Sequence, residues 1–179
     1  FSIAGHRRGF EDEKGRGNLF FELARIIQDK TPQVIFLENV KNLETHDNGN
    51  TLTTILKTLA TYGYHTTYKV LNAMHYGNIP QNRERIYIVG FLDENAYNNF
   101  TFPDPTPLTT PLDEIVDFHT KIGEKYYYTP GKYKGDIYEK LNETIDDPRA
   151  VYQWRRKYAR KNKSGVIPTL TANQGTGGH

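Results

Sequence analysis

The sequence predicts an α/β protein that has a mostly parallel sheet, followed by a smaller irregular region. In the first 92 residues, segments with helical spacing of apolar residues alternate with short strand-like runs. Four prolines then fall within residues 103–111, where they interrupt regular structure. The rest of the chain is rich in tyrosine and only weakly periodic. We therefore expect one domain over residues 1–101 and a second region over residues 102–179.

The composition excludes several classes of protein. With 179 residues, 36% hydrophobic and 25% charged, the chain is large enough for an ordinary globular core. No apolar run approaches the roughly 20 residues of a membrane helix, so we expect no membrane partner. Because cysteine is absent, these residues supply no disulfide, thiolate ligand or cysteine nucleophile. The six histidines lack the spacing of metal ligands, which predicts no metal site.

The first predicted elements follow a glycine-rich loop at residues 1–17. A helix is expected from about residue 18 to residue 27, with Asn18 as a possible cap. Its apolar face would consist of Leu19, Leu23, Ile26 and Ile27. The apolar run at residues 33–37 is typical of a strand buried on both faces, as in a parallel sheet.

The next elements repeat the helix and strand order. After a polar loop at residues 44–50, a second helix is expected, which Gly63 would end. Its apolar spacing comes from Leu52, Ile55, Leu56 and Leu59. Strands are expected at residues 64–71 and 85–91. Beyond the prolines, only residues 112–122 and 151–161 are expected to form short helices.

Charge is distributed unevenly along the chain. The formal net charge is only +2, yet residues 93–148 carry a net −7 and residues 149–179 contain seven basic and no acidic residues. A basic segment of this kind can neutralise phosphates of a nucleic acid. It can equally form a solvated face that balances the acidic stretch before it, and charge alone does not separate these alternatives.

Three local patterns combine residue types that can carry chemistry. Glu38 follows the predicted buried strand, and ligands of open α/β sheets bind at the carboxyl ends of strands. Arg83 and Arg85 are two residues apart on an extended segment, so they would share a face and could grip phosphate or carbonyl oxygens. The opening loop combines glycines with Arg7 and Arg8. Each pattern alone is also compatible with ordinary surface residues.

In this order and at this spacing, the patterns resemble the DNA (cytosine-5)-methyltransferases, especially those of bacterial restriction–modification systems. The resemblance is carried by residues 1–91, including Asn39-Val40-Lys41-Asn42-Leu43 and Ile79-Pro80-Gln81-Asn82-Arg83-Glu84-Arg85-Ile86, and resumes at residues 168–173. It implies part of a Rossmann-like sheet that binds S-adenosylmethionine, followed by a target-recognition region.

The resemblance also implies roles for individual residues. In this family a flipped cytosine receives a methyl group from S-adenosylmethionine at carbon 5, after a cysteine attacks carbon 6. Glu38 would hydrogen-bond the ring nitrogen, Arg85 the carbonyl oxygen, and Arg83 would lie near the phosphate backbone. Asn39 would brace the cysteine loop, and Leu19 would contact the cofactor. Most of the cofactor site would lie outside this chain.

Double-stranded DNA is the partner that the resemblance implies. The expected DNA-binding residues are Ser2, Gly5, Arg7, Arg8, Gln81, Arg155, Arg156, Thr169 and Leu170. Arginines can read guanine edges, whereas lysines mostly hold phosphates. The resemblance further implies a bacterial, cytoplasmic protein that protects host DNA from restriction.

The chain departs from the family in one important respect. The family's nucleophile belongs to a Pro-Cys-Gln segment just before a Phe-Ser pair, and this sequence starts at Phe1-Ser2. We therefore expect the central portion of a methyltransferase, inactive without its missing N- and C-terminal segments. The alternative is a non-catalytic DNA-binding or specificity chain of a split enzyme, whose complementary chain supplies the cysteine.

Overall fold

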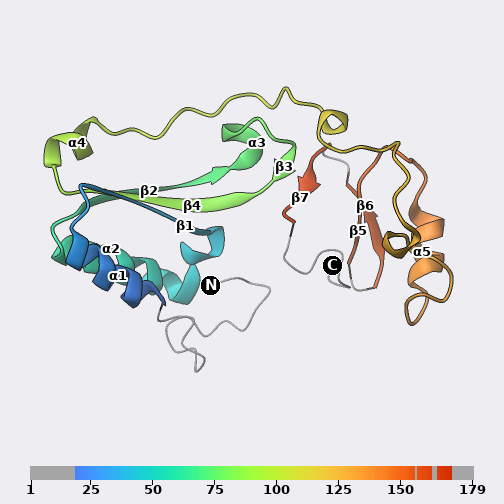
Figure 1. The fold of residues 1–179 in the computed structure, drawn as a ribbon, viewed down its shortest axis with the longest axis horizontal. Helices are drawn as coiled ribbons and strands as arrows, with labels where there is room; N and C mark the ends of the chain where they lie inside the picture. Colours follow the sequence, from blue (N-terminus) through green and yellow to red (C-terminus); the bar gives the residue numbers. More distant parts are fainter. Residues whose placement is uncertain (1–18, 156, 163–164, 171–179) are drawn as a thin grey trace. The chain divides into compact units, whose positions relative to one another are not determined.

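The computed structural model describes residues 19–155, 157–162 and 165–170. Contacts between residues divide the chain into two compact units, and Figure 1 shows the elements of each. The first combines residues up to Asn72 with Glu84–Asp104, and the second combines Ala73–Arg83 with the residues from Pro105 onward. Within the described ranges, no helix has the length and apolar character needed to cross a membrane.

The first unit contains a three-stranded sheet made of β1 (Val34–Val40), β2 (His65–Asn72) and β4 (Glu84–Phe91). The strand order is β1-β4-β2, and β4 runs antiparallel to both of its neighbours. The predicted strands are confirmed, but the expected parallel pairing is wrong for them. β1 and β2 are parallel to each other, and β4 enters the sheet between them in the opposite direction.

Helices α1 (Leu19–Lys30) and α2 (Asn50–Thr61) pack against one face of this sheet (Figure 1). The residues of α2 that face the core are the predicted ones, and the helix is followed by Gly63 at φ +87°. The core contains Ile27, Ile35, Leu43, Leu52, Ile55, Leu59, Tyr64, Ile86 and Ile88. This apolar layer fixes the sheet on which Glu38 and Arg85 lie.

The predicted apolar face of α1 is only partly correct. Ile27 is buried as expected, together with Ala24, and Phe20 packs against the same core. Leu19, Leu23 and Ile26 form a second apolar stripe, which is exposed. Because α1 carries apolar residues on two sides, its periodicity could not identify the side that is buried within the described residues.

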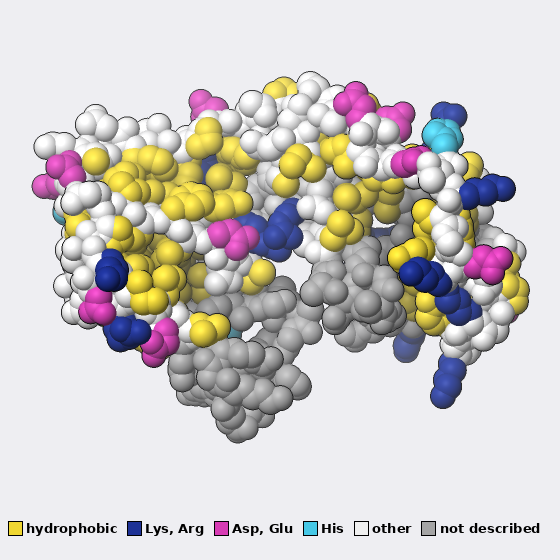
Figure 2. All heavy atoms as spheres, viewed as in Figure 1, with side chains coloured by type: hydrophobic (Ala, Val, Ile, Leu, Met, Phe, Trp, Pro, Cys, Tyr) yellow, Lys and Arg dark blue, Asp and Glu magenta, His cyan; other side chains and the backbone are white. Residues whose placement is uncertain are grey.

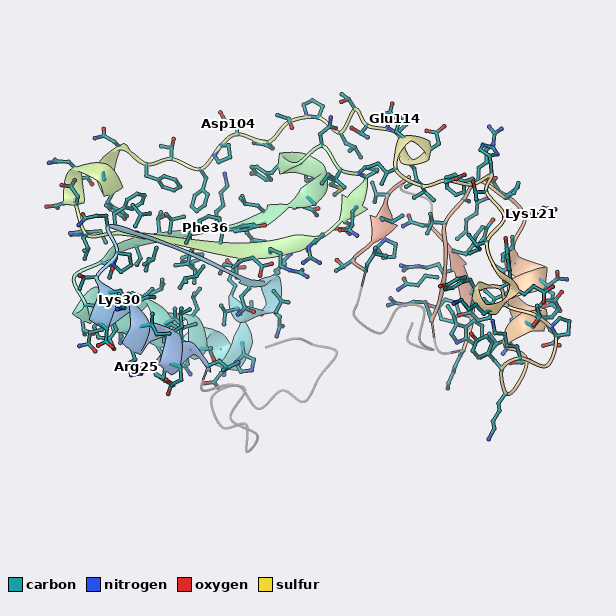
Figure 3. All side chains as sticks on the ribbon, viewed as in Figure 1. Arg25, Lys30, Phe36, Asp104, Glu114 and Lys121 are labelled. Atoms are coloured by element: carbon teal, nitrogen blue, oxygen red, sulfur yellow. The ribbon has the colours of Figure 1, made fainter. Side chains whose placement is uncertain are left out.

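Strand β1 is also less buried than its composition suggests. Ile35 points into the core, whereas Val34 and Phe36 are exposed on the opposite face, where Phe36 stacks on Tyr87 at 5.4 Å between ring centroids. Phe36 is labelled on the sheet in Figure 3, and hydrophobic side chains are visible on this unit in Figure 2. The expectation that both faces of this strand are buried is therefore wrong.

Residues that follow β4 cover part of the sheet face that is opposite α1 and α2 (Figure 1). Helix α4 (Glu94–Asn99) begins at Asp93, whose carboxylate accepts a hydrogen bond from the Ala96 amide at 2.7 Å. The aromatic rings of Phe91, Phe100 and Phe102 then pack in series, at centroid distances of 5.3 and 5.1 Å. These contacts attach the segment between β4 and the first proline, Pro103, to the first unit.

The second unit begins with residues that the sequence places inside the first domain. Helix α3 (Ala73–Tyr76) and strand β3 (Gln81–Asn82) contact residues beyond the prolines. The side chain of Asn78 accepts hydrogen bonds from the amides of Thr109 and Thr110 and donates one to the Thr109 hydroxyl. Strand β7 (Ile167–Pro168) pairs with β3 in parallel. Polar contacts thus tie residues 73–83 to the later part of the chain.

The remaining elements of this unit differ from their predictions. Helix α5 (Ile137–Thr144) was not predicted, although Asp136 and Lys140 form an i,i+4 ion pair at 2.8 Å there. The expected helix at residues 151–161 is instead a hairpin of β5 (Tyr152–Trp154) and β6 (Ala159–Lys161). Its aromatic residues favour strands over helices. The expected helix at residues 112–122 is a single turn at Leu112–Glu114.

Gly90 provides a test of the sheet packing. A Cβ atom at this position of the central strand would lie 2.8 Å from Cγ1 and 2.9 Å from Cδ1 of Ile35. We expect Gly90→Ala to lower the free energy of unfolding by about 1–3 kcal/mol, because Ile35 must move within the core. Urea unfolding followed by circular dichroism measures this change.

The control for this measurement is Gly123→Ala. A Cβ there meets no atom within 4 Å, and the backbone φ of −61° suits alanine. We expect this variant to unfold at the wild-type urea concentration. Equal stability of the Gly90 variant and wild type would contradict the close packing of β4 against Ile35.

Candidate functional site

The candidate site of the first unit is the place where the end of β1 meets the start of β4. Nε of Arg85 lies 3.0 Å from Oε1 of Glu38. Glu38 is opposite Tyr87 in the register and Arg85 is two residues away along β4, so the two side chains share one face of the sheet. The structure therefore brings together the predicted acid and one of the two predicted arginines.

The guanidinium of Arg85 is held in place from two sides. Its Nη1 donates a hydrogen bond to the Glu84 carbonyl at 2.8 Å, while Nε pairs with Glu38. The Arg85 side chain is 15% exposed and that of Glu38 is 44% exposed. The arginine is thus fixed in the protein, and the carboxylate beside it remains accessible to a ligand.

A second ion pair lies close by in the sequence but is more exposed. Nζ of Lys41 is 2.8 Å from Oε1 of Glu84, and this carboxylate raises the pKa of the lysine. Asn39 follows Glu38 on β1, so its side chain is on the opposite face of the sheet. Its Oδ1 accepts a hydrogen bond from the Val40 amide at 2.8 Å. Asn39 therefore stabilises the local backbone beside the site.

Several predicted residues belong to the second unit. Arg83 lies between β3 and β4, outside both strands, and Gln81 is the first residue of β3. The hydroxyl of Thr169 donates a hydrogen bond to the Asn82 carbonyl at 2.8 Å, next to the pairing of β3 with β7. Leu170 follows with its side chain exposed. Thr169 thus fastens the segment after β7 to β3.

The described residues do not form a cofactor site. Leu19, the expected contact for S-adenosylmethionine, is the first described residue of α1 and is 66% exposed. One exposed leucine provides apolar surface but neither a pocket nor polar partners, so these residues do not fit the cofactor by themselves. The expected DNA-binding residues Ser2, Gly5, Arg7, Arg8 and Arg156 lie outside the described residues.

The second unit also contains a hollow of about 410 Å³. Its lining includes Asp147, Arg149, Lys161 and Asn162, and the ammonium of Lys161 already lies 3.6 Å from Asp147. No group of acidic residues or histidines among the described residues could hold a metal ion. The charged side chains of its lining are one carboxylate and two cations, and one of these cations, Lys161, is already paired.

The hairpin reveals a residue that sequence reasoning missed. Gln153 pairs with Arg160 across β5 and β6, on the same strand face, and receives a hydrogen bond from Arg155. The signal was the alternation of Tyr152, Gln153 and Trp154, which is strand-like rather than helical. Among the described basic residues of this segment, Arg155, Lys157 and Arg160 are exposed, and Lys161 is half-buried.

These features agree with a sequence family. Residues 1–176 match the C-5 cytosine-specific DNA methylase family, and the chain belongs to this family. It is 57% identical over all 179 residues to the type II methyltransferase M.Bsp6I of Bacillus sp. (strain RFL6). It is also 49% identical over 116 residues, 65% of this chain, to the type II methyltransferase M.HhaI of Haemophilus parahaemolyticus.

The chain spans only part of these relatives. It covers 56% of the length of M.Bsp6I and 35% of that of M.HhaI. Among solved structures, the Entamoeba histolytica methyltransferase EhMeth aligns with 69% of this chain and 36% of its own, at 19% identity and a TM-score of 0.48. The family assignment therefore rests on the sequence matches.

The anchoring role of Thr169 can be tested directly. Thr169→Val keeps the shape of the side chain but removes the hydroxyl that donates to Asn82. Because this bond is exposed, we expect a loss of only about 0.5–1 kcal/mol. The loss should appear as faster hydrogen exchange of the Ile167 amide, which donates to the Pro80 carbonyl at 2.8 Å beside it.

The matched control is Thr129→Val in the same unit, where the side chain is exposed. We expect it to leave exchange of the Ile167 amide unchanged. If the Ile167 amide exchanges at the wild-type rate in both variants, the hydroxyl of Thr169 does not hold β3 and β7 together.

Proposed function

We propose that this chain is the central portion of a DNA (cytosine-5)-methyltransferase of a restriction–modification system. The complete enzyme would transfer a methyl group from S-adenosylmethionine to carbon 5 of a flipped cytosine and so protect host DNA from restriction. The observation that carries this proposal is the pairing of Glu38 with Arg85 at 3.0 Å on one face of the sheet. Membership of the family supports it independently.

The chemistry of cytosine explains why this pair suits the base. The Watson–Crick edge presents a carbonyl oxygen, a ring nitrogen and an amino group in a row. A guanidinium can donate to the carbonyl oxygen, while a carboxyl group beside it binds the ring nitrogen and accepts from the amino group. Arg85 and Glu38 present these groups side by side, from two neighbouring strands.

The proposed role of Glu38 is to hold a proton at the ring nitrogen. When a nucleophile adds to carbon 6, negative charge enters the ring, and a hydrogen bond at the nitrogen stabilises that charge as it develops. Arg85 stabilises the adjacent carbonyl oxygen in the same way. The cysteine nucleophile would come from a segment outside these 179 residues, which contain no cysteine.

S-adenosylmethionine would supply the electrophilic methyl group, from a site formed mainly outside this chain. Within the chain, Leu19 is the proposed cofactor contact, Arg83 the proposed contact near the DNA backbone, and Asn39 the residue that supports the nucleophile's loop. The exposed position of Leu19 at the start of α1 is compatible with contact to another segment.

A second candidate function is favoured by the hairpin of the second unit. Its exposed arginines could make this chain a DNA-binding specificity component whose catalytic partner is a separate chain. Copurification of a second polypeptide from the native source would favour this function. Methyl transfer by the single polypeptide of the complete reading frame would favour the first.

The role of Glu38 is tested by Glu38→Gln in the polypeptide encoded by the complete reading frame. We expect incorporation of labelled methyl groups into DNA to fall by about 100-fold or more, because the amide cannot supply the proton at the ring nitrogen. Fluorescence anisotropy with duplex DNA should show binding within about threefold of wild type, since phosphate contacts dominate affinity.

The control is Glu84→Gln, which removes the same charge from the neighbouring pair with Lys41. Because that pair is exposed, we expect methyl transfer to remain within about fivefold of wild type. Equal losses of methyl transfer in Glu38→Gln and Glu84→Gln would mean that the loss comes from the removed charge alone. Equal losses of transfer and DNA binding in Glu38→Gln would contradict its proposed role.

A further inference from the structure

Residues 73–83 form a loop that leaves the sheet at the end of β2 and returns to it as β4. The two ends of the loop are joined, because the Ala73 amide donates a hydrogen bond to the Arg83 carbonyl at 3.0 Å. The last residue of β2 and the first residue of β4 are then paired in the register of these strands. The loop therefore closes just before Arg85, the arginine of the candidate site.

Asn78 lies in the middle of this loop, in a backbone conformation that few residue types adopt. Its φ is +50°, in the left-handed region where glycine is unstrained and asparagine is tolerated better than most residues. The turn is thus compatible with asparagine or with glycine. Only asparagine brings a side chain that can bind another segment.

The side chain of Asn78 binds one later segment with both of its polar atoms. Its Oδ1 accepts hydrogen bonds from the amides of Thr109 and Thr110, at 2.7 and 3.1 Å. Its Nδ2 donates to the Thr109 hydroxyl at 2.9 Å. We call these three bonds the Asn78 clamp. Beside it, the Thr106 amide donates to the His75 carbonyl at 2.7 Å, so the loop is attached to the proline-rich segment.

A different part of the second unit holds the rest of the loop. The Ile167 amide donates to the Pro80 carbonyl, and the Thr169 hydroxyl donates to the Asn82 carbonyl, both at 2.8 Å. The loop is therefore attached to the later part of the chain at two places. By these contacts it belongs to the second unit, although strands of the first unit precede and follow it in the sequence.

We propose that Asn78 is a positioning residue for methyl transfer, because its clamp fixes the loop that contains Arg83 and leads into Arg85. This inference rests on the proposed function, since it concerns the reaction of that same enzyme. Nη1 of Arg85 donates to the carbonyl of Glu84, the residue that directly follows the loop. A loop that shifts would move this carbonyl and so displace the guanidinium from the base. A displacement of about 1 Å can reduce a reaction rate by about 100-fold.

The clamp contributes little to folding, so its loss can be studied in a folded protein. Its bonds are exposed or only partly buried, and hydrogen bonds of this kind add little to the free energy of unfolding. Among the described residues, the core of the first unit includes none from the loop. We therefore expect loss of the clamp to change the geometry of the reacting groups more than the stability of the protein.

The test compares two variants of the polypeptide encoded by the complete reading frame. Asn78→Gly removes the clamp and adopts the same φ without strain. Asn78→Asp retains an oxygen that accepts from the amides of Thr109 and Thr110. The substrate is plasmid DNA from a host that lacks the gene, with labelled S-adenosylmethionine and enzyme in excess. We expect the single-turnover rate of methyl transfer to fall by about 10-fold or more in Asn78→Gly and to stay within about threefold of wild type in Asn78→Asp.

Binding measurements separate positioning from a general loss of structure. Binding of duplex DNA, measured by fluorescence anisotropy, should stay within about threefold of wild type in both variants, because phosphate contacts dominate affinity. The matched control is Asn99→Gly, which removes an asparagine side chain that bonds within its own helix, to the Asn95 carbonyl at 2.9 Å. We expect Asn99→Gly to transfer methyl groups and bind DNA as the wild type does.

A variant on the other side of the clamp provides an independent measurement. Thr109→Val removes the hydroxyl that accepts from Nδ2 of Asn78 and leaves the sequence of the loop unchanged. We expect it to slow single-turnover methyl transfer by about fivefold, with DNA binding unchanged. If Asn78→Gly does not fold, Thr109→Val decides, and a wild-type rate in Thr109→Val would then overturn the inference.

The outcomes distinguish this inference from the proposed function. If the wild type transfers no methyl group to carbon 5 of cytosine, the proposed function fails and the inference fails with it. If the wild type transfers it and Asn78→Gly does so at the same rate, only the positioning role of Asn78 is wrong. Equal losses of methyl transfer and DNA binding in Asn78→Gly would also contradict that role. So would equal losses of transfer in Asn78→Gly and Asn78→Asp, because the aspartate retains the bonds to the two amides.

Discussion

The antiparallel insertion of β4 between β1 and β2 is the constraint on which the first unit depends. Glu38 lies near the end of β1 and Arg85 near the start of β4. Only opposite strand directions can bring the end of one strand to the start of its neighbour. In a wholly parallel sheet, these residues would lie at opposite edges, and the 3.0 Å ion pair could not form. The site is therefore a consequence of strand direction.

The sequence predicted those elements that carry one clear signal, either helical spacing of apolar residues or a run of apolar and β-branched residues. Helix α2 has its apolar residues on one buried face, and the strands at 65–72 and 84–91 are strongly apolar or β-branched. Periodicity failed to predict the buried face of those elements that have more apolar surface than the described residues cover. Leu23 on α1 and Phe36 on β1 belong to patterns that predict a covered face, yet both are exposed. A pattern shows that a surface is apolar, but not what covers it.

The second unit was harder to predict because polar contacts hold much of it together. Asn78 joins α3 and β3 to the segment after the prolines, and Tyr152 joins the hairpin to Asp146. Such contacts depend on one residue at one position and leave no repeating signal. The resemblance to a family supplied Glu38 and Arg85 as candidates, but it could not supply their distance or their different exposures. Those depend on the order and direction of the strands.

The basic segment shows why a count of charges could not decide between a structural and a binding role. The described basic residues of one hairpin divide between its two faces. Lys161 balances the acidic residues just before the hairpin, as a structural cation does. Arg160 is adjacent in sequence but points to the other face, because neighbouring residues of a strand alternate. The pairing of Lys161 with Asp146 and Asp147 attaches the hairpin to the segment that follows α5. The structural role of Lys161 could therefore not be assigned from the net charge of the segment, because that role depends on the strand register.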